Sequence, residues 1–236
     1  MSDPSPPAAI TSASAATGSQ CCNETWEAAY SRFETPEQEI RKFVQRLSAA
    51  GADAWPRDAA TVDLFCGRGG GLHALTRLGF TKIEGVDLSP TLLAQYQGPA
   101  HCVVADCRKL PFEDGSKDVV IVQGGLHHLP KLPEDLDQVL REVHRILKPK
   151  GLFVAVEPWL TPFLRLAHAL CENRLIRRFS PKFDALAVMI ENERTTYEQW
   201  LSQPGKILAC FQTNFGVDRQ VVGWGKIMFI GRKRLS

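Results

Sequence analysis

Carboxylates and glycines stand at the ends of short apolar runs in this sequence of 236 residues. Residues 63–71 read Asp-Leu-Phe-Cys-Gly-Arg-Gly-Gly-Gly and end the first run, while Asp87 and Asp106 end the next two. Glycines at such a turn let a ligand approach the backbone closely. Carboxylates beside them accept hydrogen bonds from hydroxyl and amino groups. The pattern predicts a binding site for a polar ligand along one edge of a sheet.

Strands that alternate with helices must position these residues. Helices are expected where apolar residues recur at three- and four-residue spacing, most strongly over residues 136–147. Strands 217–222 and 224–230 are separated by too little chain for a crossover, so they must be antiparallel neighbours. We therefore predict an α/β fold with a doubly wound, mostly parallel, seven-stranded sheet that ends in an antiparallel hairpin. The other five predicted strands are 61–66, 82–88, 101–106, 119–122 and 152–156.

Two terminal segments and one insertion accompany this pattern. Residues 1–22 have almost no bulky side chains and are predicted to form a disordered tail. Residues 23–56 carry two helical repeats of apolar residues and are predicted to form an N-terminal helical cap. Residues 57–236 make the sheet domain, and a helical insertion at about 159–203 interrupts it. Both helical additions are expected to cover the strand ends.

Composition limits the possible classes of protein. Hydrophobic residues make up 44% of the chain, which is enough for a buried core. The net charge of +2 is too balanced for a nucleic-acid binder with a broad cationic surface. No apolar stretch is long enough to span a membrane, and the first residues do not form a secretory signal. The seven cysteines lack disulfide or zinc spacing, so we expect reduced thiols and a cytoplasmic protein.

The glycine-rich turn distinguishes between nucleotide-binding families. No Gly-Lys-Ser/Thr follows, as a Walker loop would require, and Leu72 stands where the third glycine of a dinucleotide fingerprint belongs. The chain resembles the class I S-adenosylmethionine-dependent methyltransferases, whose first motif is an acidic residue followed by x-Gly-x-Gly-x-Gly. Asp63, Gly67 and Gly69 match this motif, while Phe65 replaces the first glycine. The resemblance covers about residues 60–232 and implies a Rossmann-like fold.

The resemblance also implies roles for several residues, with S-adenosyl-L-methionine as the cofactor. Asp87 matches the acidic residue that accepts hydrogen bonds from both ribose hydroxyls, and Asp106 matches the one beside the adenine amino group. Residues 118–157 resemble the small-molecule methyltransferase branch. The predicted cofactor-binding residues are Asp63, Phe65, Cys66, Gly67, Arg68, Gly69, Asp87, Leu88, Asp106, Cys107 and Gln123.

Three residues near the predicted methyl position are candidates for catalysis. His127 and His128 follow the fourth strand, and Glu157 ends the fifth. A base there would take the proton from a hydroxyl or amine as it attacks the methyl group. In-line positioning alone is the alternative, with the histidines only packing. No metal site is expected, because no cluster has ligand spacing in the sequence.

The acceptor is expected to be a small, partly apolar molecule methylated on oxygen, because the helical additions are rich in aromatic residues. A non-catalytic protein that keeps the fold is one alternative. A nucleic-acid or protein methyltransferase is another, although no Pro-Cys nucleophile follows the fourth strand. The oligomeric state stays open. The candidate residues around the acceptor are Trp26, Tyr30, Phe33, Trp159, Phe163, Leu164, Phe179, Phe183 and Met189, with packing inside the cap as the alternative for each of them. The basic residues Arg174, Arg177, Arg178 and Lys182 are expected on a solvated helix face.

Overall fold

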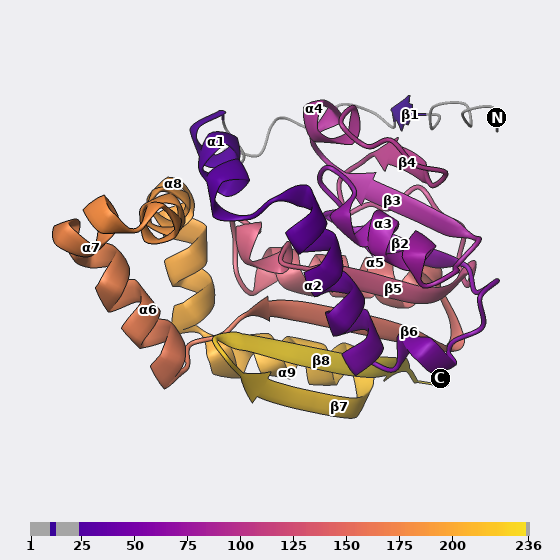
Figure 1. The fold of residues 1–236 in the computed structure, drawn as a ribbon. Helices are drawn as coiled ribbons and strands as arrows, with labels where there is room; N and C mark the ends of the chain where they lie inside the picture. Colours follow the sequence, from indigo (N-terminus) through magenta and orange to yellow (C-terminus); the bar gives the residue numbers. More distant parts are fainter. Residues whose placement is uncertain (1–9, 13–23, 235–236) are drawn as a thin grey trace, which may run out of the picture.

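A single twisted sheet organises the computed structural model, which describes residues 10–12 and 24–234 (Figure 1). The strand order is β1-β4-β3-β2-β5-β6-β8-β7. All neighbours from β1 to β6 pair in parallel, whereas β8 pairs antiparallel with both β6 and β7. The mostly parallel sheet and the terminal antiparallel hairpin are thereby confirmed. The strands are β1 (Ile10–Ser12), β2 (Thr61–Leu64), β3 (Ile83–Asp87), β4 (His101–Val104), β5 (Lys117–Gln123), β6 (Leu147–Pro158), β7 (Phe215–Gly223) and β8 (Lys226–Lys233).

The first strand is an addition to the seven that the sequence predicts. Residues 10–12 pair with β4 at the edge of the sheet, although they fall within the segment predicted to be a disordered tail. That prediction is wrong for these three residues, since an open edge strand offers backbone groups to any nearby chain. The rest of the predicted tail lies outside the described residues.

Strand β5 lies at the centre of the sheet, because its continuous apolar run must be covered on both faces. Val120 and Val122 belong to a hydrophobic cluster on one face, whereas Val119 and Ile121 belong to a cluster on the other. This alternation is the two-residue period of a strand. The sheet is therefore a middle layer between two separate cores.

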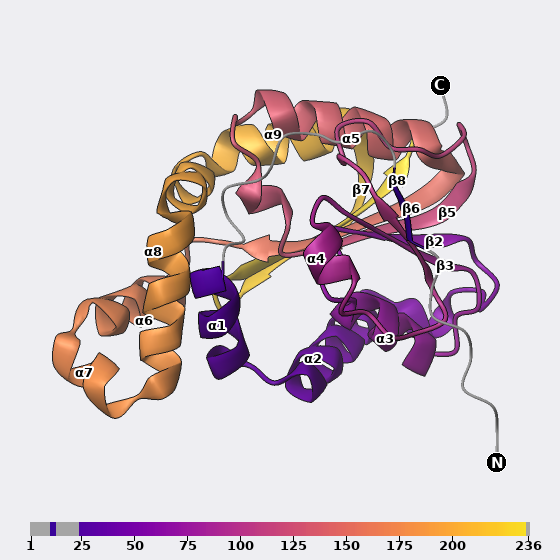
Figure 2. The ribbon, with the colours of Figure 1, turned by 90° about the horizontal axis from the view of Figure 1, so that it is seen from above.

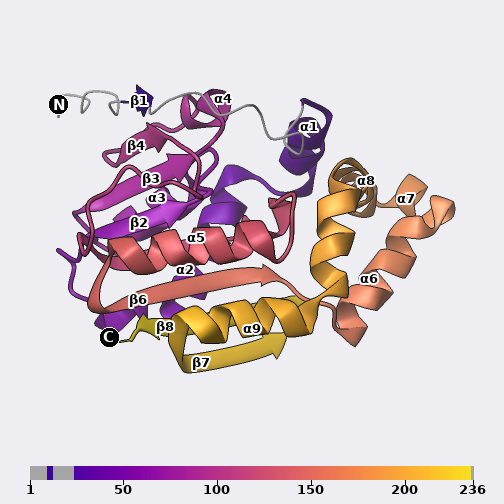
Figure 3. The same cartoon turned by 180° about the vertical axis from the view of Figure 1, so that it is seen from behind.

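Helices cover both faces of the sheet (Figures 2 and 3). Helices α5 and α9 lie over one face, and their apolar side chains join the cluster of Val120. Helices α2 and α3 lie over the other face and join the cluster of Ile121. The sequence analysis did not predict α9. These helices are α2 (Pro36–Ala49), α3 (Gly70–Arg77), α5 (Glu134–Ile146) and α9 (Pro204–Asn214), with a short helix α4 (Pro90–Leu93) beside α3 and a short η1 turn (Ala52–Ala54) after α2.

The remaining helices gather beyond the carboxyl ends of the parallel strands (Figure 1). Helix α1 (Glu24–Phe33) packs against the long helix α8 (Pro181–Ser202). Helices α6 (Pro162–Glu172) and α7 (Arg174–Phe179) extend outward from α8. The break between α1 and α2 occurs at Thr35, whose hydroxyl caps α2 in a capping box with Gln38. In the described part of the chain, no helix is long and apolar enough to cross a membrane.

Candidate active site

A cavity of about 820 Å³ opens at the carboxyl ends of β2 to β5, under α1 and α8. Its walls come from the loop after β2, from the ends of β3 and β5, and from helices that lie far away in the sequence. Ten of the eleven predicted cofactor-binding residues line it. Gly69, the N-cap residue of α3, is the exception. The ten are Asp63, Phe65, Cys66, Gly67, Arg68, Asp87, Leu88, Asp106, Cys107 and Gln123.

The loop after β2 turns tightly because three of its residues adopt left-handed backbone conformations. Phe65, Gly67 and Gly69 have φ values of 57°, 52° and 87°. A Cβ atom on Gly69 would lie 2.1 Å from the ring of Tyr96, so only glycine fits there. Phe65 takes the same conformation at the position where the motif carries glycine, and its ring packs where a Cβ of Gly125 would stand. The substituted loop thus keeps the motif's backbone turn.

Asp63 is a buried acid at the base of the cavity. Its side chain faces the start of α3, where a Cβ on Gly71 would lie 2.1 Å from its Oδ2 atom. Among the described residues, none forms a hydrogen bond or ion pair with this carboxylate. Burial raises the pKa of Asp63 well above its usual range, and the nearby carboxylates of Asp87 and Glu39 raise it further. A cation bound beside Asp63 would relieve both effects.

Asp87 and Asp106 meet the cavity in different ways. The two oxygens of Asp87 accept hydrogen bonds from the backbone N–H groups of Gly67 and Ser89, both at 2.8 Å. The carboxylate therefore ties the glycine loop to β3 and still lines the cavity. Asp106 accepts hydrogen bonds from the guanidinium and the backbone N–H of Arg108. Burial alone would raise the pKa of Asp106, but Arg108 brings it below its usual value.

Helices α1 and α2 contribute a polar network that sequence reasoning missed. Glu39 of α2 is buried, and it accepts hydrogen bonds from the hydroxyl of Tyr30 at 2.5 Å and from Nε of Arg68 at 3.0 Å. The Arg68 guanidinium also lies 4.7 Å from the centre of the Tyr30 ring, which stacks on Trp26. Burial, reinforced by Glu39, raises the pKa of Tyr30 far above its usual range. The network fastens the helical cap to the glycine loop.

His127 and Glu157 lie behind the cavity wall. Glu157 accepts hydrogen bonds from the backbone N–H groups of Gly125 and Leu126, each at 2.9 Å, and its other oxygen lies 2.7 Å from Nδ1 of His127. Burial alone would raise the pKa of Glu157, but His127 and the two N–H groups bring it below its usual value. The ionised carboxylate makes Nδ1 of His127 the donor. This pair holds the η2 turn (Leu126–His128) against β6.

His128 is the histidine of the pair that lines the cavity. Its Nδ1 atom lies 3.4 Å from Oε2 of Glu193, a buried residue of α8 that was not predicted. The same oxygen accepts a hydrogen bond from Nε1 of Trp26 at 3.2 Å. Three elements, η2, α8 and α1, therefore meet at one carboxylate.

The same region also brings metal-ligating groups together. His127, His128 and Glu193 each offer a ligand atom, and these atoms lie within 4.8 Å of one another. The trio could hold a divalent cation, since two imidazoles and a carboxylate suit zinc and similar metals. The spacing in the sequence could not indicate it, because Glu193 comes from the distant α8. The expectation that the protein needs no metal stays a prediction.

The cap residues that reach the cavity are partly those expected. Trp26 and Tyr30 line it, whereas Phe33 does not. None of the aromatic and apolar residues expected from the insertion lines it, and Phe163 and Phe179 are exposed on the outside. That prediction is wrong because the second half of α8 presents polar side chains to the cavity. The residues of α8 that line it are Asn192, Glu193, Thr195 and Thr196.

Comparisons with known proteins support this arrangement. Residues 62–155 match the model of a methyltransferase domain. The chain is 31% identical over 147 residues to the ubiquinone/menaquinone biosynthesis C-methyltransferase of Rubrivivax gelatinosus, covering 58% of this chain and 57% of the relative. It is 33% identical over 105 residues to a sterol 4-C-methyltransferase of Caenorhabditis elegans, covering 41% of this chain and 30% of the relative. The chain thus spans about a third to just over half the length of the curated relatives it matches.

Solved structures extend the likeness over most of the fold. The PH0226 protein of Pyrococcus horikoshii superposes with a TM-score of 0.67 at 22% identity, covering 90% of this chain and all of that one. An S-adenosylmethionine-dependent methyltransferase of Mesorhizobium loti gives 0.53 at 20% identity, covering 79% and 96%. Residues 62–155 therefore belong to a methyltransferase domain, and the chain has the fold of the class I S-adenosylmethionine-dependent methyltransferases.

The residues of this methyltransferase domain fit the cofactor that the family implies. S-adenosylmethionine carries an ammonium group and a sulfonium, and the cavity offers three carboxylates within reach of one another's charge: Asp63, Asp87 and Glu39. Gln123, at the end of β5, has both side-chain amide atoms buried without a hydrogen-bond partner in the described structure. A ligand with donors and acceptors would satisfy that amide. The individual contacts of the eleven predicted residues stay predictions.

Proposed function

We propose that this methyltransferase transfers a methyl group from S-adenosylmethionine to an oxygen atom of a small, partly apolar molecule. The observation that carries the proposal is His128, which lines the same cavity as the cofactor residues and is paired with the Glu193 carboxylate. Trp26 and Tyr30 supply an apolar wall on the cap side. The cavity volume of about 820 Å³ lies within the range of small-molecule sites.

The side chains divide the work of the reaction between them. The negative charge of Glu193, 3.4 Å from Nδ1 of His128, favours a proton on that nitrogen, which leaves Nε2 to accept the proton of the acceptor. His128 takes the proton of the acceptor hydroxyl. As it does so, the hydroxyl oxygen forms a bond to the methyl carbon, and the bond between that carbon and the sulfur breaks. The bound cofactor supplies the activated methyl group. His127 and Glu157 act as positioning residues, because their buried hydrogen bonds fix the turn that carries His128.

The test supplies S-adenosylmethionine with a labelled methyl group and a panel of phenols, quinols and hydroxylated lipids. His128→Ala should lower turnover by about 10²–10⁴-fold on an acceptor that the wild type methylates, with the affinity for S-adenosylhomocysteine unchanged. His101→Ala, at an exposed position on β4, is the matched control and should retain turnover. Unchanged turnover in His128→Ala would refute the role of a base.

Two further readouts distinguish the remaining alternatives. The names of the relatives include C-methyltransferases, so the position of the new methyl group is to be determined by nuclear magnetic resonance. A methyl group on carbon would overturn the oxygen assignment. Dialysis against a chelator is expected to leave turnover intact. Loss of turnover that zinc restores would instead assign His127, His128 and Glu193 to a metal site.

A further inference from the structure

The outer face of α6 and α7 exposes large apolar side chains. Phe163 and Leu166 on α6 are 48% and 59% exposed, while Leu175 and Phe179 on α7 are 68% and 82% exposed. Spacings of three and four residues place each pair on one side of its helix. Both helices pack mainly on α8 and on each other, and Figures 1 and 3 show them at the far end of the molecule. This face is uncovered in the chain as described.

Trp224 extends the same surface from the tip of the β7–β8 hairpin. It is 81% exposed, and its ring lies 5.3 Å from that of Phe163. Trp224 and Gly225 form the two-residue turn, with φ values of 50° and 77°. A turn with two positive φ values favours Asn-Gly, and a bulky residue there is unusual. The geometry of the turn therefore does not explain why a tryptophan occupies this position. The exposed indole is more consistent with a role in contacting a partner surface.

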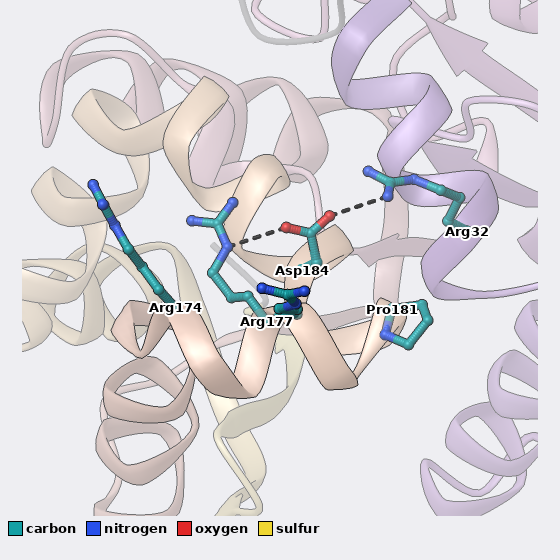
Figure 4. A pocket seen from close by; sticks show the side chains of 6 residues that line it. Arg32, Arg174, Arg177, Pro181 and Asp184 are labelled. Carbon is teal, nitrogen blue, oxygen red and sulfur yellow. Dashed lines mark hydrogen bonds and ion pairs between the residues drawn. The ribbon is translucent and has the colours of Figure 1, made fainter.

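The segment that carries these helices has an excess of positive charge. Residues 162–182 contain five arginines and lysines but only one acidic residue. Arg177 and Arg32 share the carboxylate of Asp184 in a shallow recess of about 610 Å³, shown in Figure 4. Four other basic residues have no carboxylate within ion-pair distance among the described residues, and all four are exposed. They are Arg165, Arg174, Arg178 and Lys182.

We propose that the α6–α7 face, together with Trp224, docks on a membrane surface rich in anionic lipids. Exposed phenylalanine, leucine and tryptophan side chains would enter the boundary between headgroups and acyl chains, where aromatic rings are favoured. The unpaired arginines and lysine would contact lipid phosphates and carboxylates. The complementarity between this cationic surface and anionic headgroups selects a lipid bilayer as the occupant. The proposal goes beyond the methyl-transfer function and does not depend on it.

Sedimentation with vesicles tests the proposal without any acceptor. The full chain is mixed with vesicles of phosphatidylcholine alone or with 30% phosphatidylserine. It should sediment with the anionic vesicles, less with the neutral ones, and less again at high salt. Arg174→Ala/Arg178→Ala should lower the partition coefficient by roughly 10–30-fold. Lys109→Ala/Lys206→Ala removes the same charge at exposed positions elsewhere and should leave binding nearly unchanged.

The apolar contribution is tested by variants that preserve the fold. Trp224→Asn suits the turn and removes the indole, and Phe179→Ser alters a side chain that is 82% exposed. Both should weaken vesicle binding at least several-fold and keep the circular dichroism spectrum, whereas Val217→Ser, an exposed apolar control on β7, should not. Absence of sedimentation, or equal binding by the apolar variants, would overturn the proposal. A concentration-dependent dimer that Phe179→Ser abolishes would assign the face to a second copy instead.

Discussion

Replacing Asp63 by asparagine is expected to stabilise the free protein and to weaken its binding of the cofactor. The Asp63 carboxylate is buried, has no hydrogen-bond partner in the described structure, and faces the negative charges of Asp87 and Glu39. A neutral amide of nearly the same shape escapes that repulsion. The same variant would remove the negative charge that we propose to bind the positively charged cofactor. Stability and binding therefore change in opposite directions.

The magnitudes follow from the cost of burying polar groups. A buried amide without partners costs about 1–3 kcal/mol, whereas an unpaired buried charge costs several kcal/mol. We expect a gain of about 1–2 kcal/mol in the free energy of unfolding for Asp63→Asn. For a chain of this size that gain corresponds to about 2–8 °C in the melting temperature. Loss of a hydrogen bond between charged groups should weaken cofactor binding by about 10- to 150-fold.

The stability gain depends on pH in a defined direction. The pKa of Asp63 is raised in the folded state above its ordinary value of 3.8. As the pH falls, the folded protein therefore takes up this proton before the unfolded chain does. The loss of stability caused by the buried charge is complete at a pH above the raised pKa and vanishes below pH 3.8. The gain from asparagine should grow as the pH rises from 3.8 toward the raised pKa of Asp63 and should disappear in acid.

Thermal unfolding and calorimetric titration with S-adenosylhomocysteine measure the two effects. Asp106→Asn is the matched control, since Asp106 is paired with Arg108 and its pKa is lowered despite burial. That substitution should lower the melting temperature at neutral pH. The reasoning fails if Asp63→Asn melts at or below the wild-type temperature, or if it binds the cofactor product as tightly as the wild type.

Three other substitutions probe the glycine loop and the buried pair of Glu157 and His127. Asp87→Ala should weaken S-adenosylhomocysteine binding by about 2–3 kcal/mol in calorimetric titration, because it removes the carboxylate that we expect to accept two hydrogen bonds from the ribose. Unchanged affinity would show that Asp87 does not bind the ribose. Gly69→Ala should lower the free energy of unfolding by at least about 2 kcal/mol in urea, since its φ is 87° and the Tyr96 ring fills the space of the Cβ; a wild-type midpoint would contradict the tight turn. Glu157→Leu should cost about 3–5 kcal/mol by leaving His127 and two backbone N–H groups unpaired. The pKa of Glu157 is lowered in the folded protein, so the stabilisation that Glu157 contributes is complete above the ordinary pKa of 4.5. This stabilisation is lost as the pH falls through the lowered pKa. The Glu157→Leu variant should not show this loss of stability in acid.

Local patterns were sufficient to predict seven of the strands and the residues that line the cavity at the strand ends. Each strand of the parallel sheet is a short apolar run, and the residue type at its end was enough to place Asp63, Asp87, Asp106 and Gln123 along one edge. Parallel strands align their carboxyl ends at one edge of the sheet. Functional side chains that are far apart in the sequence therefore lie close together because of the topology alone. The capping signal at Thr35 likewise predicted the boundary between α1 and α2, because it depends only on residues next to each other in the sequence.

Only the tertiary structure decided which residues line the cavity under α1 and α8. Trp26 and Glu193 meet across 167 residues of sequence because α1 packs on α8, and no local pattern encodes that contact. Adjacent histidines were equivalent as sequence, yet Glu157 holds His127 behind the wall while His128 faces the cavity. The aromatic and apolar residues expected from the insertion do not line the cavity, because helical periodicity defines an apolar face without indicating what covers it. The packing of helix against helix therefore determined which side chains reach the cavity, and which remain on the outer surface.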